Sequence, residues 1–258
     1  MGIEINSLAG AGGINSNTGI YRQNFGNNTG MPADSFENNS ISRYTTEAAI
    51  KKMILNNPKI DRIMKEINAP IVLNMAELKT LQEEHAADVK NIAAGVAGNL
   101  PFALKSKVDL KSLEDAAYLH DIGKVLIPAQ ILNKTGELDP KEKEIMSRHA
   151  ELGYELLKTT GINNYTLNLV RNHHQNAKRT GYPWVQKDFY ADISLQILAA
   201  ADKYSALLEK RPYKNSIPPK QALTIIYQDV KENKLHPFVF RALVDYVNTQ
   251  KHVAINSV

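Results

Sequence analysis

The sequence predicts an all-α protein with one main domain. From about residue 44 onward, apolar residues recur at spacings of three and four, which is the periodicity of amphipathic helices. No segment shows the alternating pattern of a half-buried strand, and the sequence contains no internal repeat and no glycine-rich phosphate loop. With 258 residues and 43% hydrophobic content, such a chain can bury a sizeable core without disulfides.

Composition narrows the function classes. The 31 basic and 27 acidic residues give a net charge of +4, and the basic residues are dispersed, so we expect no nucleic-acid polymer as a partner. No apolar stretch approaches the roughly 20 residues of a membrane helix, and the N-terminus lacks a secretory pattern. The absence of cysteine fits a cytoplasmic location, and it means that any metal must be held by histidines and carboxylates.

The first 76 residues carry no recognisable chemistry. Residues 1–43 are rich in Asn, Gly and Ser and lack periodicity, which predicts a disordered tail. Residues 44–76 should form packing helices, the first around Ile50 and Met53 and the second around Ile60, with a break at Pro58 and a stop before Pro70. The main helical domain is then expected over residues 77–251, followed by a short tail over 252–258.

A long helix is predicted over about residues 75–100. One apolar stripe runs along it and contains Leu78, Leu81, His85, Val89, Ile92 and Val96. A single histidine on such a stripe is more often a hydrogen-bonded core residue than a metal ligand. His85 by itself therefore leaves both interpretations open.

The segment from Ala116 to Pro128 is the one around which the rest is organised. It is expected to begin as a helix at a capping-box-like start, Ser112-Leu-Glu-Asp, and it places His120 and Asp121 side by side on an apolar element. Burying an imidazole and a carboxylate is costly unless both find a partner. A divalent metal is a partner that suits both groups, and Lys124 follows one turn later.

Two further helices carry histidines. Asp139 followed by proline predicts a helix start, and the helix should run past His149 on its buried face to a stop near Gly161. The next helix begins near Asn164 and reaches His173 and His174. Adjacent helical residues diverge by about 100°. The two rings either converge on a bound metal or point one inward and one outward.

The last part of the chain is also helical. A helix over about residues 189–210 carries Asp202 among alanines, where a carboxylate requires a partner although half-exposed helical aspartates are common. Two amphipathic helices over about 219–233 and 237–251 complete the chain. In all, five histidines and two aspartates lie on faces that should be buried, which describes a site for two divalent cations. Such sites catalyse phosphoryl displacement.

The motifs resemble those of the HD-GYP family. This family is a branch of the HD-domain metal-dependent phosphohydrolases, and its members hydrolyse cyclic di-GMP. The resemblance covers roughly residues 80–245 and lies in five ordered motifs: His120-Asp121-Ile-Gly-Lys124 with Ile127-Pro128 and residues 132–138, His149 with Gly153, His173-His174, Gly181-Tyr182-Pro183, and Asp202 with Arg211-Pro-Tyr213. It implies an HD-domain helical bundle with additional N- and C-terminal helices.

The resemblance also implies roles for individual residues. One metal would be held by His85, His120, Asp121 and Asp202, and the second by Asp121, His149, His173 and His174, with Asp121 bridging. The metals would be Fe or Mn, and a hydroxide bridging them would attack the phosphorus of cyclic di-GMP. The residues implied to contact the substrate are Lys124, Tyr182, Arg211 and Lys214, with Lys178 and Arg179 as additions peculiar to this chain.

Several positions depart from the family pattern. Leu81 stands where members with three metals have a glutamate, Gln175 replaces the glutamate after the paired histidines, and Ser205 replaces a second aspartate. Lys178-Arg179 replaces an Asp-Gly pair. Two alternatives therefore stay open: a weak or inactive sensor of cyclic di-GMP, and an HD hydrolase for another nucleotide or phosphoester. A homodimer or a signalling partner is also open.

Overall fold

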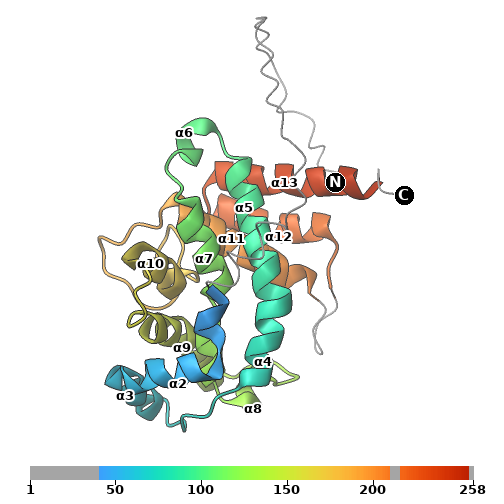
Figure 1. Ribbon diagram of the computed structural model, residues 1–258. Coiled ribbons are helices and arrows are strands. Elements are labelled where there is room, and N and C mark those ends of the chain that lie inside the picture. Colours follow the sequence, from blue (N-terminus) through green and yellow to red (C-terminus); the bar gives the residue numbers. More distant parts are fainter. Residues whose placement is uncertain (1–40, 210–215, 256–258) are drawn as a thin grey trace, which may run out of the picture.

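The computed structural model describes residues 41–209 and 216–255 (Figure 1). All regular elements in these two ranges are helices, which confirms the predicted fold class. Most of the predicted tail, together with Arg211 and Lys214, lies outside the described residues. Ile41, which was assigned to the tail, is buried against the core.

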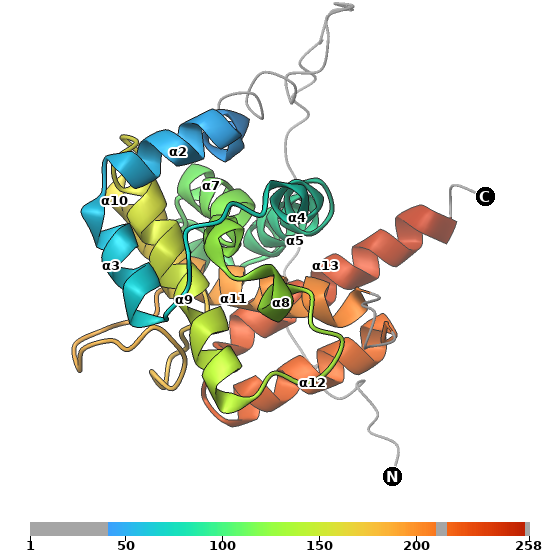
Figure 2. The same ribbon diagram turned by 90° about the horizontal axis from the view of Figure 1, so that it is seen from below.

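The N-terminal helices pack on one side of the molecule. A short turn, η1 (Arg43–Thr45), leads into α2 (Glu47–Leu55) and α3 (Pro58–Glu66). The break between the helices falls at Asn57, whose side chain caps α3 by accepting from the backbone N–H of Lys59 at 3.1 Å. Both helices contact α9 (Pro140–Leu157), as Figures 1 and 2 show.

The helix predicted over residues 75–100 is continuous, but its middle turn is π-helical. α4 (Met75–Thr80) runs into the π-helical segment η2 (Leu81–Ala86) and then into α5 (Ala87–Gly98). A π turn closes its hydrogen bond over one residue more than an α turn, and such turns occur mostly at functional sites. Because His85 lies in this turn, the extra residue changes the direction in which its side chain leaves the helix.

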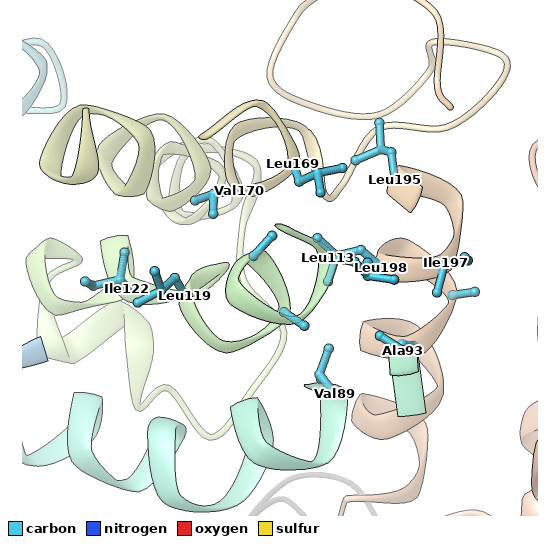
Figure 3. Packing of buried hydrophobic residues seen from close by; sticks show 14 of the residues in the cluster. Val89, Ala93, Leu113, Leu119, Ile122, Leu169, Val170, Leu195, Ile197 and Leu198 are labelled. Carbon is cyan, nitrogen blue, oxygen red and sulfur yellow. The ribbon is translucent and has the colours of Figure 1, made fainter. Parts of the chain in front are cut away.

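Helix α7 (Leu110–Leu119) lies in the middle of the core. It packs between α5 and α10 (Asn164–Asn172), with α11 (Ile193–Leu208) alongside (Figure 3). Leu113 and Leu119 of α7 are fully buried, against Val89 of α5 and Val170 of α10 among others. Each buried side chain of this size stabilises the fold by about 1.5–3 kcal/mol. Through this packing the core fixes the end of α7, where the chemistry begins.

The ends of α7 differ from the prediction. The helix is capped by Asp109, which accepts from the backbone N–H of Ser112 at 3.1 Å, so the expected start at Ser112 was wrong. The hydroxyl of Ser112 also donates to Asp109 at 2.8 Å, so Ser112 is the hydrogen-bond donor to the N-cap residue and is not the N-cap itself. The helix ends at Leu119, and η3 (Ile122–Leu126) follows. His120 and Asp121 therefore lie at the junction of two helical segments, not within one.

Two other helix ends were misplaced. Helix α10 ends at Asn172, so His173 and His174 lie in the turn that follows it, and the 100° relation between helical neighbours does not apply to them. Helix α11 begins at Ile193, not near residue 189, because Asp192 caps it by accepting from Leu195 N–H at 2.8 Å.

The remaining helices frame the core. Helix α9 begins as predicted, with Asp139 and Glu142 forming a capping box, and ends at Leu157. The short helices α6 (Phe102–Lys105) and α8 (Ala129–Leu132) join longer ones, and α12 (Pro219–Lys231) and α13 (Pro237–Ile255) close the described part of the chain. The backbone of α13 continues into the segment predicted as a tail. Every helix in the described residues is too short or too polar to cross a membrane.

Candidate metal centre

Three histidines are oriented by the same kind of hydrogen bond to the backbone. The Nδ1 atoms of His120, His149 and His173 each donate to a backbone carbonyl three residues earlier, at 2.8, 2.6 and 2.7 Å respectively. This assigns the proton to Nδ1 and leaves the lone pair of Nε2 directed away from the backbone. All three rings are almost completely buried, between 0 and 1% exposed. Each ring thus presents one fixed acceptor nitrogen to the interior.

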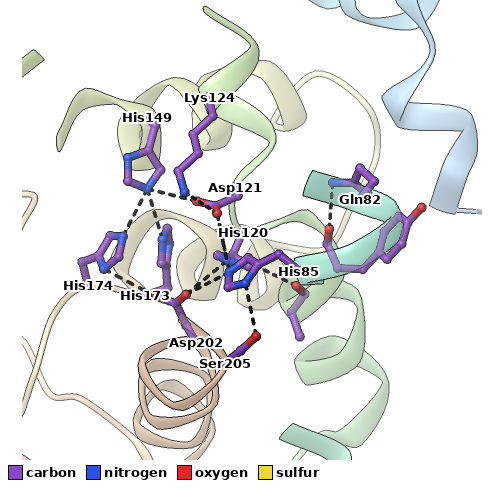
Figure 4. Close-up of polar contacts among 12 residues, drawn as sticks. Gln82, His85, His120, Asp121, Lys124, His149, His173, His174, Asp202 and Ser205 are labelled. Atoms are coloured by element: carbon purple, nitrogen blue, oxygen red, sulfur yellow. Dashed lines mark hydrogen bonds and ion pairs between the residues drawn. The ribbon is translucent and has the colours of Figure 1, made fainter. Parts of the chain in front are cut away.

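Asp121 lies between two groups of histidines (Figure 4). Its Oδ1 is 3.3 Å from Nε2 of His149, whereas its Oδ2 is 3.3 Å from Nε2 of His120 and 3.8 Å from Nε2 of His85. The two oxygens of one carboxylate therefore face different groups of potential ligands. This is the arrangement required of a carboxylate that bridges two cations.

Two groups of ligand atoms flank this carboxylate. His149, His173 and His174 form one group, and His85, His120 and Asp202 form the other, with the ligand atoms of each group lying within 4.8 Å of one another. His120, Asp121 and His173 form a third such set across the middle. The structure thus brings all seven predicted ligands into one cluster. They come from five places in the chain: η2, the junction of α7 and η3, helix α9, the turn that follows α10, and helix α11.

The protonation states of the histidines differ between the two sides of the cluster. Burial lowers the pKa of His149 and of His174 to about 3, and it lowers that of His173 well below its usual value. The pKa values of Asp121 and Asp202 are held well below their usual range: burial opposes this, but nearby cationic and histidine side chains outweigh it. His85 and His120 differ from these three histidines. Burial lowers the pKa of both, but Asp202 with Glu209 outweighs it at His85, whose pKa is raised, and Asp121 with Asp202 raises the pKa of His120 to about 10. A metal binds neutral imidazoles beside ionised carboxylates, so a cation at His85 and His120 would displace a proton from each ring.

Two features of the cluster lack an explanation within the protein. Nε2 of His149 lies 3.3 Å from Nε2 of His173 and 3.2 Å from Nε2 of His174. With the Nδ1 atoms of His149 and His173 protonated, their facing Nε2 atoms are both acceptors and repel each other. In addition, Nε2 of His120 and Oδ1 of Asp121 are buried without a hydrogen-bond partner. A cation satisfies both features, so the residues present fit a divalent metal.

The other predicted site residues fall into three groups. Lys124 lies in the cluster, its Nζ 2.6 Å from Oδ2 of Asp121, and the ring of Tyr182 lies 4.5 Å from that of His174. Lys178 and Arg179 are exposed, and Arg179 donates to the backbone carbonyl of Lys187, so the loop itself holds its guanidinium. Arg211 and Lys214 lie outside the described residues.

Sequence reasoning missed Glu209. Its Oε1 contacts Nδ1 of His85, and the Oγ of Ser205 lies 3.3 Å from the same nitrogen. Glu209 follows Asp202 by seven residues and Ser205 by four, a spacing that places all three on one face at the C-terminal end of α11. This spacing is the feature of the sequence that could have indicated Glu209 as a residue of the site. A carboxylate one helical turn beyond Ser205 thus faces the candidate ligand.

Gln175 fixes the loop that carries Tyr182. Its Oε1 accepts from the backbone N–H of Gly181 at 3.2 Å, and its Nε2 donates to the carbonyl of Pro183 at 2.5 Å. An amide supplies both a donor and an acceptor, whereas an ionised glutamate at this position accepts only. The departure from the family pattern at Gln175 therefore has a structural role in this chain.

A cavity of about 430 Å³ opens beside the cluster. Its walls include His173, His174 and Asp202 from the cluster and, further out, Thr180, Lys203 and Lys234. This volume lies within the range of small-molecule sites. The lysines that line the cavity are Lys203 and Lys234, and not the predicted Lys178.

The comparison with protein families identifies the class. A family model described as HD domain matches residues 70–238, which is more than half of the chain. The chain belongs to the HD domain family. Within that family it is of the HD-GYP type, as its motifs predicted and as its curated relatives support.

Three curated relatives are informative. The chain is 39% identical to a cyclic di-GMP phosphodiesterase of Thermotoga maritima over 45% of this chain and 32% of the relative. It is 36% identical to the cyclic di-GMP phosphodiesterase response regulator RpfG of Xanthomonas campestris over 47% and 33%. It is 32% identical to the 3'3'-cGAMP-specific phosphodiesterase 2 of Vibrio cholerae over 59% and 30%. The matches thus span about a third of the length of these relatives.

A solved structure shares the fold. The HDG"Y"P protein from Bdellovibrio bacteriovorus superposes with a TM-score of 0.54 and 18% sequence identity, covering 83% of this chain and 67% of that one. At this identity the likeness concerns the fold alone. It confirms the helical architecture of an HD-type domain.

Proposed function

We propose that this chain is a metal-dependent phosphodiesterase that hydrolyses a cyclic dinucleotide, and that cyclic di-GMP is its substrate. The observation that carries the proposal is the carboxylate of Asp121, whose two oxygens face two groups of histidines. Two closely spaced cations that share a ligand can stabilise both the attacking and the leaving oxygens of a phosphodiester during hydrolysis. The names of the Thermotoga and Xanthomonas relatives support the choice of substrate.

The residues that would hold the cations follow from the two groups. His85, His120 and Asp202 would hold one divalent ion and His149, His173 and His174 the other, with Asp121 shared. Nitrogen and oxygen ligands without thiolate suit Fe or Mn. Such ions, when bound, stabilise charge on the oxygens of the reacting phosphate and supply a nucleophile from water at neutral pH.

The protein itself supplies position and charge. The Nδ1 hydrogen bonds of three histidines hold the rings in place before any ligand arrives, which lowers the cost of reorganisation. Lys124 brings a positive charge to the edge of the cluster, where a phosphate oxygen of the substrate would bind. Burial raises the pKa of Tyr182, so its hydroxyl stays protonated and can donate to the substrate.

A second candidate substrate has its own support. The Vibrio cholerae relative is named as specific for 3'3'-cGAMP, and it matches more of this chain than the other two relatives described above. A cyclic dinucleotide with one adenine carries the same two phosphates, so the metal centre would not distinguish it. Discrimination would come from the groups that contact the bases.

One assay tests the proposal. The full chain, loaded with Mn²⁺ or Fe²⁺ under anaerobic conditions, is incubated with cyclic di-GMP, 3'3'-cGAMP and bis(p-nitrophenyl) phosphate, and products are separated by chromatography. We expect metal-dependent cleavage of cyclic di-GMP, no cleavage by the Asp121→Ala variant, and a lower rate on the simple ester. Equal rates on all three would favour a general phosphohydrolase. Binding without product in metal-loaded protein would identify a sensor.

Location and partners remain predictions. The absence of cysteine fits a reducing compartment, so we propose a cytoplasmic setting. A homodimer or a signalling partner would be detected by the mass of the full chain in solution.

A further inference from the structure

A second cavity lies outside the metal centre. Its volume is about 520 Å³, and it lies between the last two turns of α10 and the segment 184–192 that leads into α11. The lining residues that matter here are Tyr165, Arg171, Asn172, Trp184, Asp188 and Tyr190. None of them is among the seven candidate metal ligands or the predicted substrate contacts.

The cavity presents large aromatic side chains to solvent. Trp184 is 80% exposed and Tyr190 is 77% exposed. Exposed aromatic side chains gathered at a concave site are typical of places where a flat ligand stacks. Trp184 is also the single tryptophan of the chain. The aromatic content of this cavity therefore favours a planar ligand.

Its polar groups specify the kind of planar ligand. Arg171 offers guanidinium donors, and Asp188 offers carboxylate acceptors, in the same cavity. Guanine has acceptors at O6 and N7, which suit arginine, and donors at N1 and N2, which suit a carboxylate. Adenine lacks both the O6 acceptor and the N1 and N2 donors. The pair of charges thus matches guanine better than any other common base.

Hydrogen bonds hold two of the side chains that line the cavity, Arg171 and Tyr165. Arg171 donates to the side-chain oxygen of Asn172 at 3.3 Å, and Asn172 in turn donates to the carbonyl of Asn168 at 2.9 Å. On the other side, the hydroxyl of Tyr165 donates to Asp192 at 2.8 Å, and Asp192 caps α11. Arg171 and Tyr165 are thus held in place before a ligand binds, which lowers the entropic cost of binding at this side of the cavity.

We propose that this cavity binds the guanine base of a nucleotide, with the base stacked on Trp184 and its edge read by Arg171 and Asp188. The site is separate from the metal centre, and it does not depend on turnover there. It is nevertheless connected to it through the chain. Asn172 directly precedes His173, and Trp184 directly follows Pro183, which Gln175 holds. A nucleotide bound here would contact both ends of the segment that carries the paired histidines.

The single tryptophan provides a direct test. The fluorescence of the full-length Asp121→Ala variant, which should not consume nucleotide, is titrated with GMP, AMP and cyclic di-GMP. We expect saturable quenching by GMP and binding of AMP weaker by at least about tenfold. Tighter binding of cyclic di-GMP than of GMP would identify the cyclic dinucleotide as the ligand, and equal affinity would identify the mononucleotide. Linear quenching equal to that of free tryptophan amide would overturn the proposal, as would equal binding of AMP.

Two variants separate the cavity from the metal centre. Arg171→Ala and Asp188→Asn should each weaken GMP binding by about tenfold while leaving the metal content of an otherwise wild-type chain unchanged. Asp188 is exposed, so its substitution tests recognition without disturbing folding. Unchanged affinity in both variants would contradict the assignment. If nucleotides do not bind and Trp184 instead becomes shielded as the chain self-associates, the cavity is a protein interface and the proposal is wrong.

Discussion

Glu209 contacts Nδ1 of His85 through its Oε1, while Nε2 of the same ring lies 3.1 Å from Asp202. His85 thus differs from His120, His149 and His173, whose Nδ1 atoms each donate to a backbone carbonyl. A carboxylate behind a metal-binding imidazole fixes its orientation and increases its basicity. Glu209 is therefore a positioning residue for the candidate metal centre.

The first prediction concerns Glu209. Glu209→Ala should weaken metal retention by about 10–100-fold, the usual effect of removing such a partner. Glu209→Gln should retain more metal than the alanine variant, because its amide oxygen can still accept from Nδ1. Retention is measured by dialysis against a graded series of chelator concentrations followed by elemental analysis. Glu83→Gln, at an exposed position on the same helical segment as His85, serves as control. Equal retention by all variants would refute the positioning role.

The second prediction concerns Lys124. Removing this charge by Lys124→Ala should lower kcat for cyclic di-GMP by about 10²–10³, as when one group that stabilises transition-state charge is removed. Steady-state kinetics on metal-loaded protein measure the effect, with metal content determined in parallel. Lys52→Ala, on the exposed surface of α2, is the matched control. A change in KM alone would show that Lys124 binds the substrate without assisting the reaction.

The third prediction concerns the close approach of η3 to α9. A methyl group at Gly123 would lie 2.0 Å from the carbonyl oxygen of His149 and 2.5 Å from the N–H nitrogen of Gly153, so the two segments must move apart. Gly123→Ala should therefore destabilise the fold by about 1–3 kcal/mol or more and should lower metal content, because Asp121 moves away from His149.

Gly98 offers the control for this substitution. It is exposed at the end of α5, and a methyl group there meets no atom within 4 Å. Gly98→Ala should be neutral or stabilising by up to about 1 kcal/mol. Urea unfolding of both variants measures the difference. If Gly123→Ala proved as harmless as Gly98→Ala, then η3 and α9 would not be in the contact described.

The fourth prediction concerns Glu155, which is 1% exposed beneath α3. Burial raises the pKa of its carboxyl, but hydrogen bonds from Lys158, Lys59 and Asn57 outweigh burial, and the pKa is lowered from 4.5. A lowered pKa gives a stabilisation that is present above about pH 4.5 and is lost as the pH falls through the folded-state value. Glu155→Gln should therefore destabilise by about 1–3 kcal/mol at pH 7 and by less at pH 3.

Unfolding by urea at several pH values checks this dependence. The control is Glu47→Gln, since Glu47 is an exposed residue paired with Lys51 and should contribute less than about 1 kcal/mol at any pH. A cost of Glu155→Gln that stays constant between pH 7 and pH 3 would show that the ionised carboxylate does not stabilise the fold.

Much of the fold was predictable from periodicity. The apolar stripes that pack α5, α9 and α11 into the core are visible in the sequence at spacings of three and four. The N-cap at Asp139 was predicted because proline follows it directly in the sequence, whereas the part of Glu142 in a capping box was seen only in the structure. The start of α7 was not, because Ser112 and Asp109 are both good caps and only the geometry shows which of them accepts. The π turn at His85 was not predictable, because a segment of six residues is too short to show a change in the spacing of apolar residues.

The candidate ligands were predictable as residues, and the resemblance to the HD-GYP family also implied two groups around Asp121, but the local structure that carries these residues was not predictable. His120 and Asp121 stood out because polar neighbours in an apolar segment need a partner. Their positions at a helix junction, and those of His173 and His174 in a turn, depend on where helices end, which is the least reliable part of sequence reasoning. The contact between Glu209 and His85 joins residues 124 positions apart, and a single sequence gives no information on such pairs.

The metal content of the purified chain tests the central claim most directly. Elemental analysis after loading and desalting should find close to two divalent ions per chain in the wild type. Asp121→Ala should lose both ions, because each oxygen of this carboxylate faces one group of histidines, whereas His149→Ala should lose mainly one. No bound metal in the carefully loaded wild type, or two ions retained by Asp121→Ala, would contradict the account.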